Sequence, residues 1–240
     1  STLAQSCTDV GVPVVQFNRI SDLGGLTRYA TSSVTSDNAA GGRLAAELLV
    51  ARGYKRIAFL AGLEDSSTSL ERERGFKEAL SELGTSVSYR DTGHYSFDGA
   101  KDAARRLFGH ADRPDAVFVA NDHMAIAVMD VLRQEFCLRV PEDVGVVGFD
   151  DVPQAAWGAY QLTTVYQRVE PMVDATVELL LEQMRGEVRA REESALSFRV
   201  GGNLVRRNVV AGARVQRGEV LAVVGPGDLQ LQAQADCTYF

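Results

Sequence analysis

Short apolar segments alternate with helical patterns along most of this chain, and this alternation constrains the fold more than any other feature. The apolar segments are nearly continuous rather than half polar, which is typical of strands buried on both faces of a parallel sheet. We therefore predict an α/β fold in which helices cover both faces of the sheet. The predicted strands are Val12–Phe17, Arg56–Ala61, Val87–Tyr89, Ala116–Val119, Val144–Phe149 and Thr163–Tyr166.

The helices between these strands carry start and stop signals of their own. Ser36 or Asp37 can cap a helix that ends at Gly53. Asp98 is expected to cap a later helix, and Pro171 to open the last one. The other predicted helices are Leu70–Leu83 and Met124–Phe136, and further strand candidates are Leu196–Val200 and Leu204–Arg206.

Charge and motif content exclude several classes of function. The 240 residues carry 25 Lys and Arg against 32 Asp and Glu, a net charge of −7, so the chain lacks the basic face that nucleic-acid binding needs. No apolar run approaches the roughly 18–20 residues that cross a bilayer, so we expect no membrane span. Three separated cysteines favour a reducing, cytoplasmic compartment. Common catalytic motifs and metal-ligand spacings are absent from the sequence, so we expect neither a cofactor nor a metal.

Polar side chains gather just beyond the carboxyl ends of the predicted strands, where open α/β sheets bind their ligands. Arginine, aspartate and asparagine in such a place can pair with the adjacent hydroxyls of a vicinal diol, and an aromatic ring can cover the apolar face of a sugar. The candidate residues are Asn18, Arg19, Ser66, Thr68, Arg72, Tyr95, Asn121 and Asp150. Structural alternatives stay open: Asp122 suits a helix cap, Asp151 a structural role and Tyr95 simple packing.

Two stretches of the chain resemble the LacI/GalR family of bacterial transcription regulators. One is SDNAAGGRLAAELLVARGYKRIAFLAG at Ser36–Gly62. The other is Asp115–Pro153, which contains RVPEDVGVVGFDD and is followed by LTTVYQ at Leu162–Gln167. The resemblance covers about Val10 to Val210. It implies the type I periplasmic-binding-protein fold, in which two doubly wound parallel-sheet subdomains are joined by three crossovers around a ligand cleft.

The same resemblance divides the chain into parts. Residues 1–36 and 168–193 match an N-terminal subdomain that lacks its first strand and is therefore incomplete. Residues 37–167 and 194–210 match a C-terminal subdomain. Residues 211–240 form a tail of glycine-punctuated β-type runs, either unrelated sequence or the source of a strand that replaces the missing first one.

Residue by residue, the resemblance implies a sugar-binding set. Asn18–Arg19 match the family's pair that hydrogen-bonds sugar hydroxyls, and Arg72 matches the ligand arginine of a RERGF-like motif. Tyr95 matches the aromatic that stacks on the ligand. The other matches are the asparagine of the ND-M-A motif, the first aspartate of GFDD and the hinge glutamine, here Asn121, Asp150 and Gln167.

Three positions depart from the family pattern. Ala127 and Cys137 stand where glycine is usual, and Tyr160–Gln161 replaces a pair of prolines. Cys137 would therefore have to adopt the left-handed backbone conformation after its helix, or the helix would have to end differently.

The function that the resemblance implies is sugar sensing by a homodimeric transcriptional regulator, not an enzyme. Operator DNA would be bound through a helix-turn-helix headpiece that this chain lacks, and ligand would act by shifting the population toward the closed cleft. The alternative is a periplasmic sugar-binding receptor of a transport or chemotaxis system. A further rival is a small sugar-phosphate hydrolase that uses Asp150 and Asp151 with a metal or a base.

Overall fold

The computed structural model describes residues 6–7, 12–18, 32–185, 204–207 and 222–224. The chain divides into two compact units, Ser1–Met184 and Arg185–Phe240. Within the described residues, no helix combines the length and apolar character needed to cross a membrane.

The first unit contains a five-stranded, all-parallel sheet. Its strands follow the order β4-β3-β5-β6-β7. Their bounds are Ile57–Ala61 for β3, Val87–Thr92 for β4, Ala116–Val119 for β5, Gly145–Asp150 for β6 and Thr163–Tyr166 for β7. The central strands β3 and β5 are buried throughout, which confirms the α/β prediction from their continuous apolar runs.

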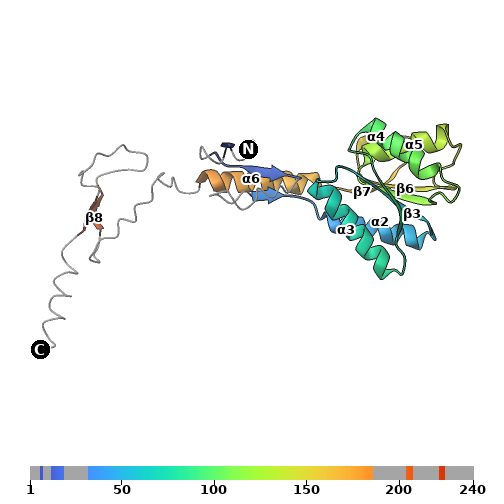
Figure 1. The fold of residues 1–240 in the computed structure, drawn as a ribbon. Helices are drawn as coiled ribbons and strands as arrows, with labels where there is room; N and C mark the ends of the chain where they lie inside the picture. Colours follow the sequence, from blue (N-terminus) through green and yellow to red (C-terminus); the bar gives the residue numbers. More distant parts are fainter. Residues whose placement is uncertain (1–5, 8–11, 19–31, 186–203, 208–221, 225–240) are drawn as a thin grey trace, which may run out of the picture. The chain divides into compact units, whose positions relative to one another are not determined.

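Helices cover both faces of this sheet, as the prediction of a doubly wound fold requires. Helices α2 and α3 lie on one face, and α4 and α5 lie on the other (Figure 1). They span Asn38–Ala51, Ser67–Glu82, Phe97–Phe108 and Asp122–Gln134, and a short 3₁₀ turn, η1, spans Pro153–Ala156. Helices α3, α4 and α5 each connect one strand of this sheet to the next, and because all five strands are parallel, their carboxyl ends meet at one edge.

The caps of the helices are partly as predicted. Asp37 caps α2 by accepting a hydrogen bond from the Ala40 amide at 2.9 Å. The prediction for Asp98 is wrong, because Ser96 caps α4 by accepting from the Gly99 amide and Asp98 lies in the first turn. There a carboxylate still interacts favourably with the helix dipole.

The core on the α2–α3 face contains three aromatic rings in mutual contact. The ring centroids of Phe59, Phe76 and Phe118 lie 4.9–5.9 Å apart at tilted angles. Glycines let the two helices approach closely: a Cβ on Gly42 would meet the Arg72 carbonyl oxygen at 2.2 Å. This close approach fixes the part of α3 that carries Arg72.

The N-terminal part of the first unit is a parallel pair of short strands with one helix. Strand β1, Val15–Phe17, pairs with β2, Ser32–Val34, and α6 spans Val169–Arg185. Hydrogen bonds tie α6 to the β2 region, from Ser36 Oγ to the Met172 sulfur and from Gln183 to Ser32. Helix α6 begins two residues before Pro171, which is tolerated because first-turn amides have no helical partner.

The second unit contains an antiparallel pair, β8 (Leu204–Arg207) and β9 (Ala222–Val224). Strand β8 confirms the candidate at Leu204–Arg206, but its partner comes from residues 211–240 rather than from the five-stranded sheet. The placement of residues 194–210 in the C-terminal subdomain stays a prediction. The candidate strand at Leu196–Val200 and the third crossover, near residue 194, lie outside the described residues. The boundaries between the N-terminal and C-terminal subdomains at residues 36 and 168 stay predictions.

The departures from the family pattern are accommodated in the backbone. Cys137 adopts a φ of +53°, the left-handed conformation expected for it, and Gln161 a φ of +46°. The Leu138 amide, directly after Cys137, donates to the carbonyl of Leu132 at 2.9 Å and so closes the end of α5.

Candidate functional site

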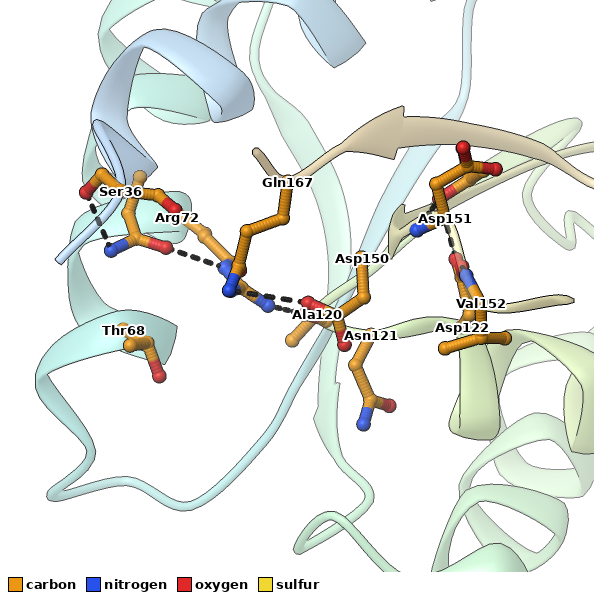
Figure 2. A network of polar contacts seen from close by, with 12 residues as sticks. Ser36, Thr68, Arg72, Ala120, Asn121, Asp122, Asp150, Asp151, Val152 and Gln167 are labelled. Carbon is orange, nitrogen blue, oxygen red and sulfur yellow. Dashed lines mark hydrogen bonds and ion pairs between the residues drawn. The ribbon is translucent and has the colours of Figure 1, made fainter. Parts of the chain in front are cut away.

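The candidate site lies at the carboxyl edge of the five-stranded sheet, where Figure 2 shows Gln167, Arg72, Ala120 and Asp150 converging. The structure brings together most of the predicted residues there. Ser66, Thr68 and Arg72 follow β3, Tyr95 follows β4, Asn121 follows β5, Asp150 ends β6 and Gln167 follows β7. Asn18 follows β1 in the N-terminal part, and Arg19 lies outside the described residues.

Arg72 is the centre of this site. Its side chain is only 3% exposed, and its Nε donates to Asn38 Oδ1 at 2.8 Å. One terminal nitrogen donates to the carbonyl of Ala120, and the other donates to Gln167 Oε1 at 3.1 Å. A buried guanidinium needs such partners, because its donors cannot reach water. Arg72 is therefore held rigidly between α2, the end of β5 and the segment after β7.

Asp150 completes the set of partners around the guanidinium. Its Oδ1 lies 3.4 Å from the second terminal nitrogen of Arg72, and its side chain keeps 30% exposure. Burial raises the pKa of Asp150 to about 6, with the Arg72 charge acting in the opposite direction and the Asp122 charge adding to the rise. The exposed part of the carboxyl can accept hydrogen bonds from a ligand while Arg72 holds its other oxygen.

The turn that carries Asp150 has an unusual backbone. Asp150 and Asp151 have φ values of +119° and +58°, a region that residues with a side chain rarely adopt. Each such residue costs of order 1–3 kcal/mol and persists only where surrounding contacts enforce it. Strained backbone of this kind is concentrated at binding and catalytic sites, which supports the assignment of Asp150.

The structural alternative in which Asp122 caps a helix is wrong. Asn121, not Asp122, caps α5, because its Oδ1 accepts from the Met124 amide at 3.0 Å. Asp122 is fully buried and accepts hydrogen bonds from the Val152 amide at 3.0 Å and from the Thr164 hydroxyl at 2.6 Å. Burial raises the pKa of Asp122 as well. The capping oxygen of Asn121 is occupied, whereas its amide nitrogen has no such role and can donate to a ligand.

Three hydroxyl groups form a second polar element of the candidate site. Ser66 Oγ lies 2.9 Å from Thr68 Oγ1, which lies 3.2 Å from the phenol oxygen of Tyr95. The ring of Tyr95 packs over Gly62, where any Cβ would meet ring atoms within 2.5 Å. Tyr95 is therefore fixed by both packing and a hydrogen bond. A chain of hydroxyls can both donate to and accept from ligand hydroxyls.

Asn18 has an unsatisfied group. Its Oδ1 is buried without a hydrogen-bond partner, and its backbone has a φ of +52°. A buried acceptor without a partner is costly unless a water or ligand supplies a donor. This observation supports Asn18 as a candidate ligand-binding residue.

Sequence reasoning missed Asn38 and Thr164. Asn38 is 1% exposed and links Arg72 to the start of α2, and Thr164 contacts Asp122. Both residues lie in stretches that resemble the family, but neither was assigned a role, because Asn38 follows a helix cap and Thr164 lies within a predicted strand. Among the described residues, no group of three or more His, Cys, Asp or Glu side chains is arranged to hold a metal ion.

Comparison with known proteins places this chain in a family. Residues 46–201 match the periplasmic binding protein-like domain. The HTH-type transcriptional regulator CelR of Thermobifida fusca is 38% identical over 208 residues, which are 83% of this chain and 59% of that protein. The ribose operon repressor of Escherichia coli is 35% identical over 156 residues, 64% of this chain and 47% of the repressor.

Solved structures give the same result. The CelR–cellobiose complex superposes with a TM-score of 0.70 at 37% identity, covering 77% of this chain and 56% of that one. A LacI transcriptional regulator from a Rhodococcus species gives a TM-score of 0.66 at 32% identity, covering 73% and 63%. This chain thus spans about half to three fifths of the curated relatives it matches. The chain belongs to the family of periplasmic binding protein-like domains, and it corresponds to the effector-binding region of LacI-type transcriptional regulators.

Proposed function

We propose that this chain senses a sugar or sugar derivative on behalf of a LacI-type transcriptional regulator. The observation that carries the proposal is the buried Arg72, rigidly held and paired with the partly exposed carboxyl of Asp150 at the carboxyl edge of the sheet. A fixed donor beside a fixed acceptor suits the vicinal hydroxyls of a sugar. The cellobiose complex of CelR and the name of the ribose operon repressor support a saccharide effector.

The remaining candidates take complementary roles in this proposal. Asn18 and Arg19 contact the sugar from the N-terminal part, and Tyr95 covers its apolar face. The hydroxyls of Ser66 and Thr68, the Asn121 amide and the hinge residue Gln167 complete the set, all acting by hydrogen bonding. Asp150 acts as a hydrogen-bond acceptor for the sugar through the part of its carboxyl that Arg72 leaves exposed.

The regulatory step in this proposal is a shift of population. In the family's fold, effector binds between the N-terminal and C-terminal subdomains and stabilises their closed arrangement. This changes the affinity of the whole regulator for operator DNA. The regulator acts in the cytoplasm as a homodimer and binds DNA through a headpiece outside this chain.

Isothermal titration calorimetry of this chain with cellobiose, ribose and hypoxanthine tests the proposal. The purine is included because relatives named PurR match the chain at 32% identity over 193 residues. We expect heat of binding from a sugar, lost in Asp150→Ala and retained in Asp143→Ala, whose carboxylate pairs with Arg139 before the start of β6. Binding of the purine alone, or sugar binding that survives Asp150→Ala, would contradict the assignment.

A further inference from the structure

Asp122 bridges three separate segments of the chain. It is the first residue of α5 and is fully buried. Its two carboxylate oxygens accept from the Thr164 hydroxyl of β7 and from the Val152 amide of the turn after β6. Figure 2 shows it beside Asp151 and Val152. The space around it is fitted to the carboxylate, because a Cβ on Gly148 would meet Asp122 Oδ1 at 2.1 Å.

These bonds enforce the left-handed turn at the end of β6. The Asp151 amide donates to Thr164 Oγ1 at 3.3 Å, and Thr164 donates in turn to Asp122 at 2.6 Å. The next amide, of Val152, donates directly to Asp122. Two consecutive amides of the turn are thus bound through one carboxylate, directly after Asp150 and its φ of +119°. A turn with this backbone needs such external contacts to persist.

The same junction also holds the partner of Asp150. The carbonyl of Ala120, two residues before Asp122, accepts a hydrogen bond from Arg72. Residues 120–122 therefore contact Arg72 on one side and the Asp150 turn on the other. The separation between the guanidinium and the carboxyl, 3.4 Å, depends on this short rigid segment.

We infer that Asp122, acting through Thr164, is a positioning residue for effector binding: it holds the Asp150 carboxyl where it faces both Arg72 and the ligand. Asp122 itself is buried and does not contact the effector. The inference rests on the proposed function insofar as Asp150 binds the effector. The position of the Asp150 carboxyl, however, can be measured without any ligand.

Thr164→Val is the sharpest variant, because it removes one hydroxyl while preserving the branched shape and the number of charges. NMR titration of the Asp150 carboxyl follows its position, since burial there raises its pKa to about 6. We expect Thr164→Val to move this pKa toward the ordinary value and to weaken sugar binding about tenfold. Thr164→Ser should restore both properties, and Thr163→Val, at an exposed site on the same strand, should leave both unchanged.

If Thr164→Val only lowered the stability of the protein, the measurements would differ from this expectation. In that case Thr164→Val lowers the melting temperature, while the pKa of Asp150 and the affinity measured well below melting stay as in the wild type, and the inference is overturned. In an Asp150→Asn background Thr164→Val should weaken binding no further; an undiminished tenfold loss there would also overturn it. If Thr164→Val does not fold, Asp122→Asn tests the affinity change. If neither cellobiose nor ribose binds the wild type, the proposed function fails, and the ligand-free titration still decides the positioning role.

Discussion

The guanidinium carbon of Arg72 lies 3.6 Å from the centroid of the Phe149 ring. The planar cation therefore stacks on the residue that directly precedes its ion-pair partner, Asp150, in β6. Stacking uses the face of the guanidinium, and the edge remains available for hydrogen bonds to Asn38, Ala120 and Gln167. One strand end thus supplies both the surface on which Arg72 rests and the carboxylate with which it pairs.

Arg72→Lys should therefore behave as a severe substitution. An ammonium cannot stack on Phe149 as a planar group or reach all the acceptors at once, so buried oxygens of Asn38 and Ala120 lose their donors. We expect the free energy of unfolding to fall by about 2–4 kcal/mol and sugar binding to weaken at least about tenfold.

Chemical denaturation and calorimetry measure the two effects. Arg74→Lys is the matched control, since Arg74 lies two residues further along α3 with an exposed side chain paired to Glu78. Its effect on unfolding should stay within about 0.5 kcal/mol. Near-equal effects of the two substitutions would contradict the central role of Arg72.

The raised pKa of Asp150 predicts how stability depends on pH. A carboxyl whose pKa is higher in the folded state, here about 6 against an ordinary 3.8, binds its proton more readily when folded. Its contribution to stability is full below the ordinary value and declines as the pH rises through the folded value. Relative to Asp150→Asn, the wild type should therefore lose at most about 3 kcal/mol between pH 4 and pH 7.

Urea denaturation at several pH values measures this difference. Asp143→Asn serves as the control, because Arg139 lowers the pKa of Asp143 to about 2, and that carboxyl stays ionised across the window. A wild type that gains stability over Asp150→Asn as the pH rises would show that attraction to Arg72 outweighs burial.

The sequence predicted those elements whose local pattern agrees with their tertiary surroundings. Strands β5 and β7 have the predicted bounds, Ala116–Val119 and Thr163–Tyr166. Strand β4 extends three residues beyond Tyr89, because Arg90 pairs with Glu64 and Glu73 and makes a polar sequence acceptable at the edge of the sheet. Strand β1 is shorter than predicted, because only Val15–Phe17 find partners in β2.

The candidate site shows more clearly that residues were predicted only where the local sequence indicates their role. Arg72 and Asp150 could be found because they lie at or beyond strand ends on the ligand-binding edge and match a family motif. The role of Asp122 could not, because its partners Val152 and Thr164 lie 30 and 42 residues away. In the sequence alone, Asp122 looks like an aspartate at the start of a helix. Only the folded structure brings the turn after β6 close to it.

Gly42→Ala tests the close packing of α2 against α3. In an exposed helix this change would stabilise by about 1 kcal/mol, but here the new Cβ would meet the Arg72 carbonyl oxygen at 2.2 Å. We expect a loss of about 1–3 kcal/mol in the free energy of unfolding, measured by denaturation. Gly158→Ala, where a Cβ would meet nothing within 4 Å, should change stability by less than about 0.5 kcal/mol. A stabilised Gly42→Ala would mean that the helices are not in contact there.

Cys137→Gly should make the protein more stable. Cys137 is exposed and holds a φ of +53° after the end of α5, a conformation that costs a residue with a Cβ about 1–2 kcal/mol. Glycine removes this cost but adds about 0.5–1 kcal/mol of unfolded-state entropy, so we expect a net gain of about 0.5–1 kcal/mol in denaturation experiments. Cys137→Ala, which keeps the Cβ, should not show the gain. An alanine variant more stable than the glycine variant by about 0.5–1 kcal/mol, the entropy difference alone, would contradict a strained backbone at this position.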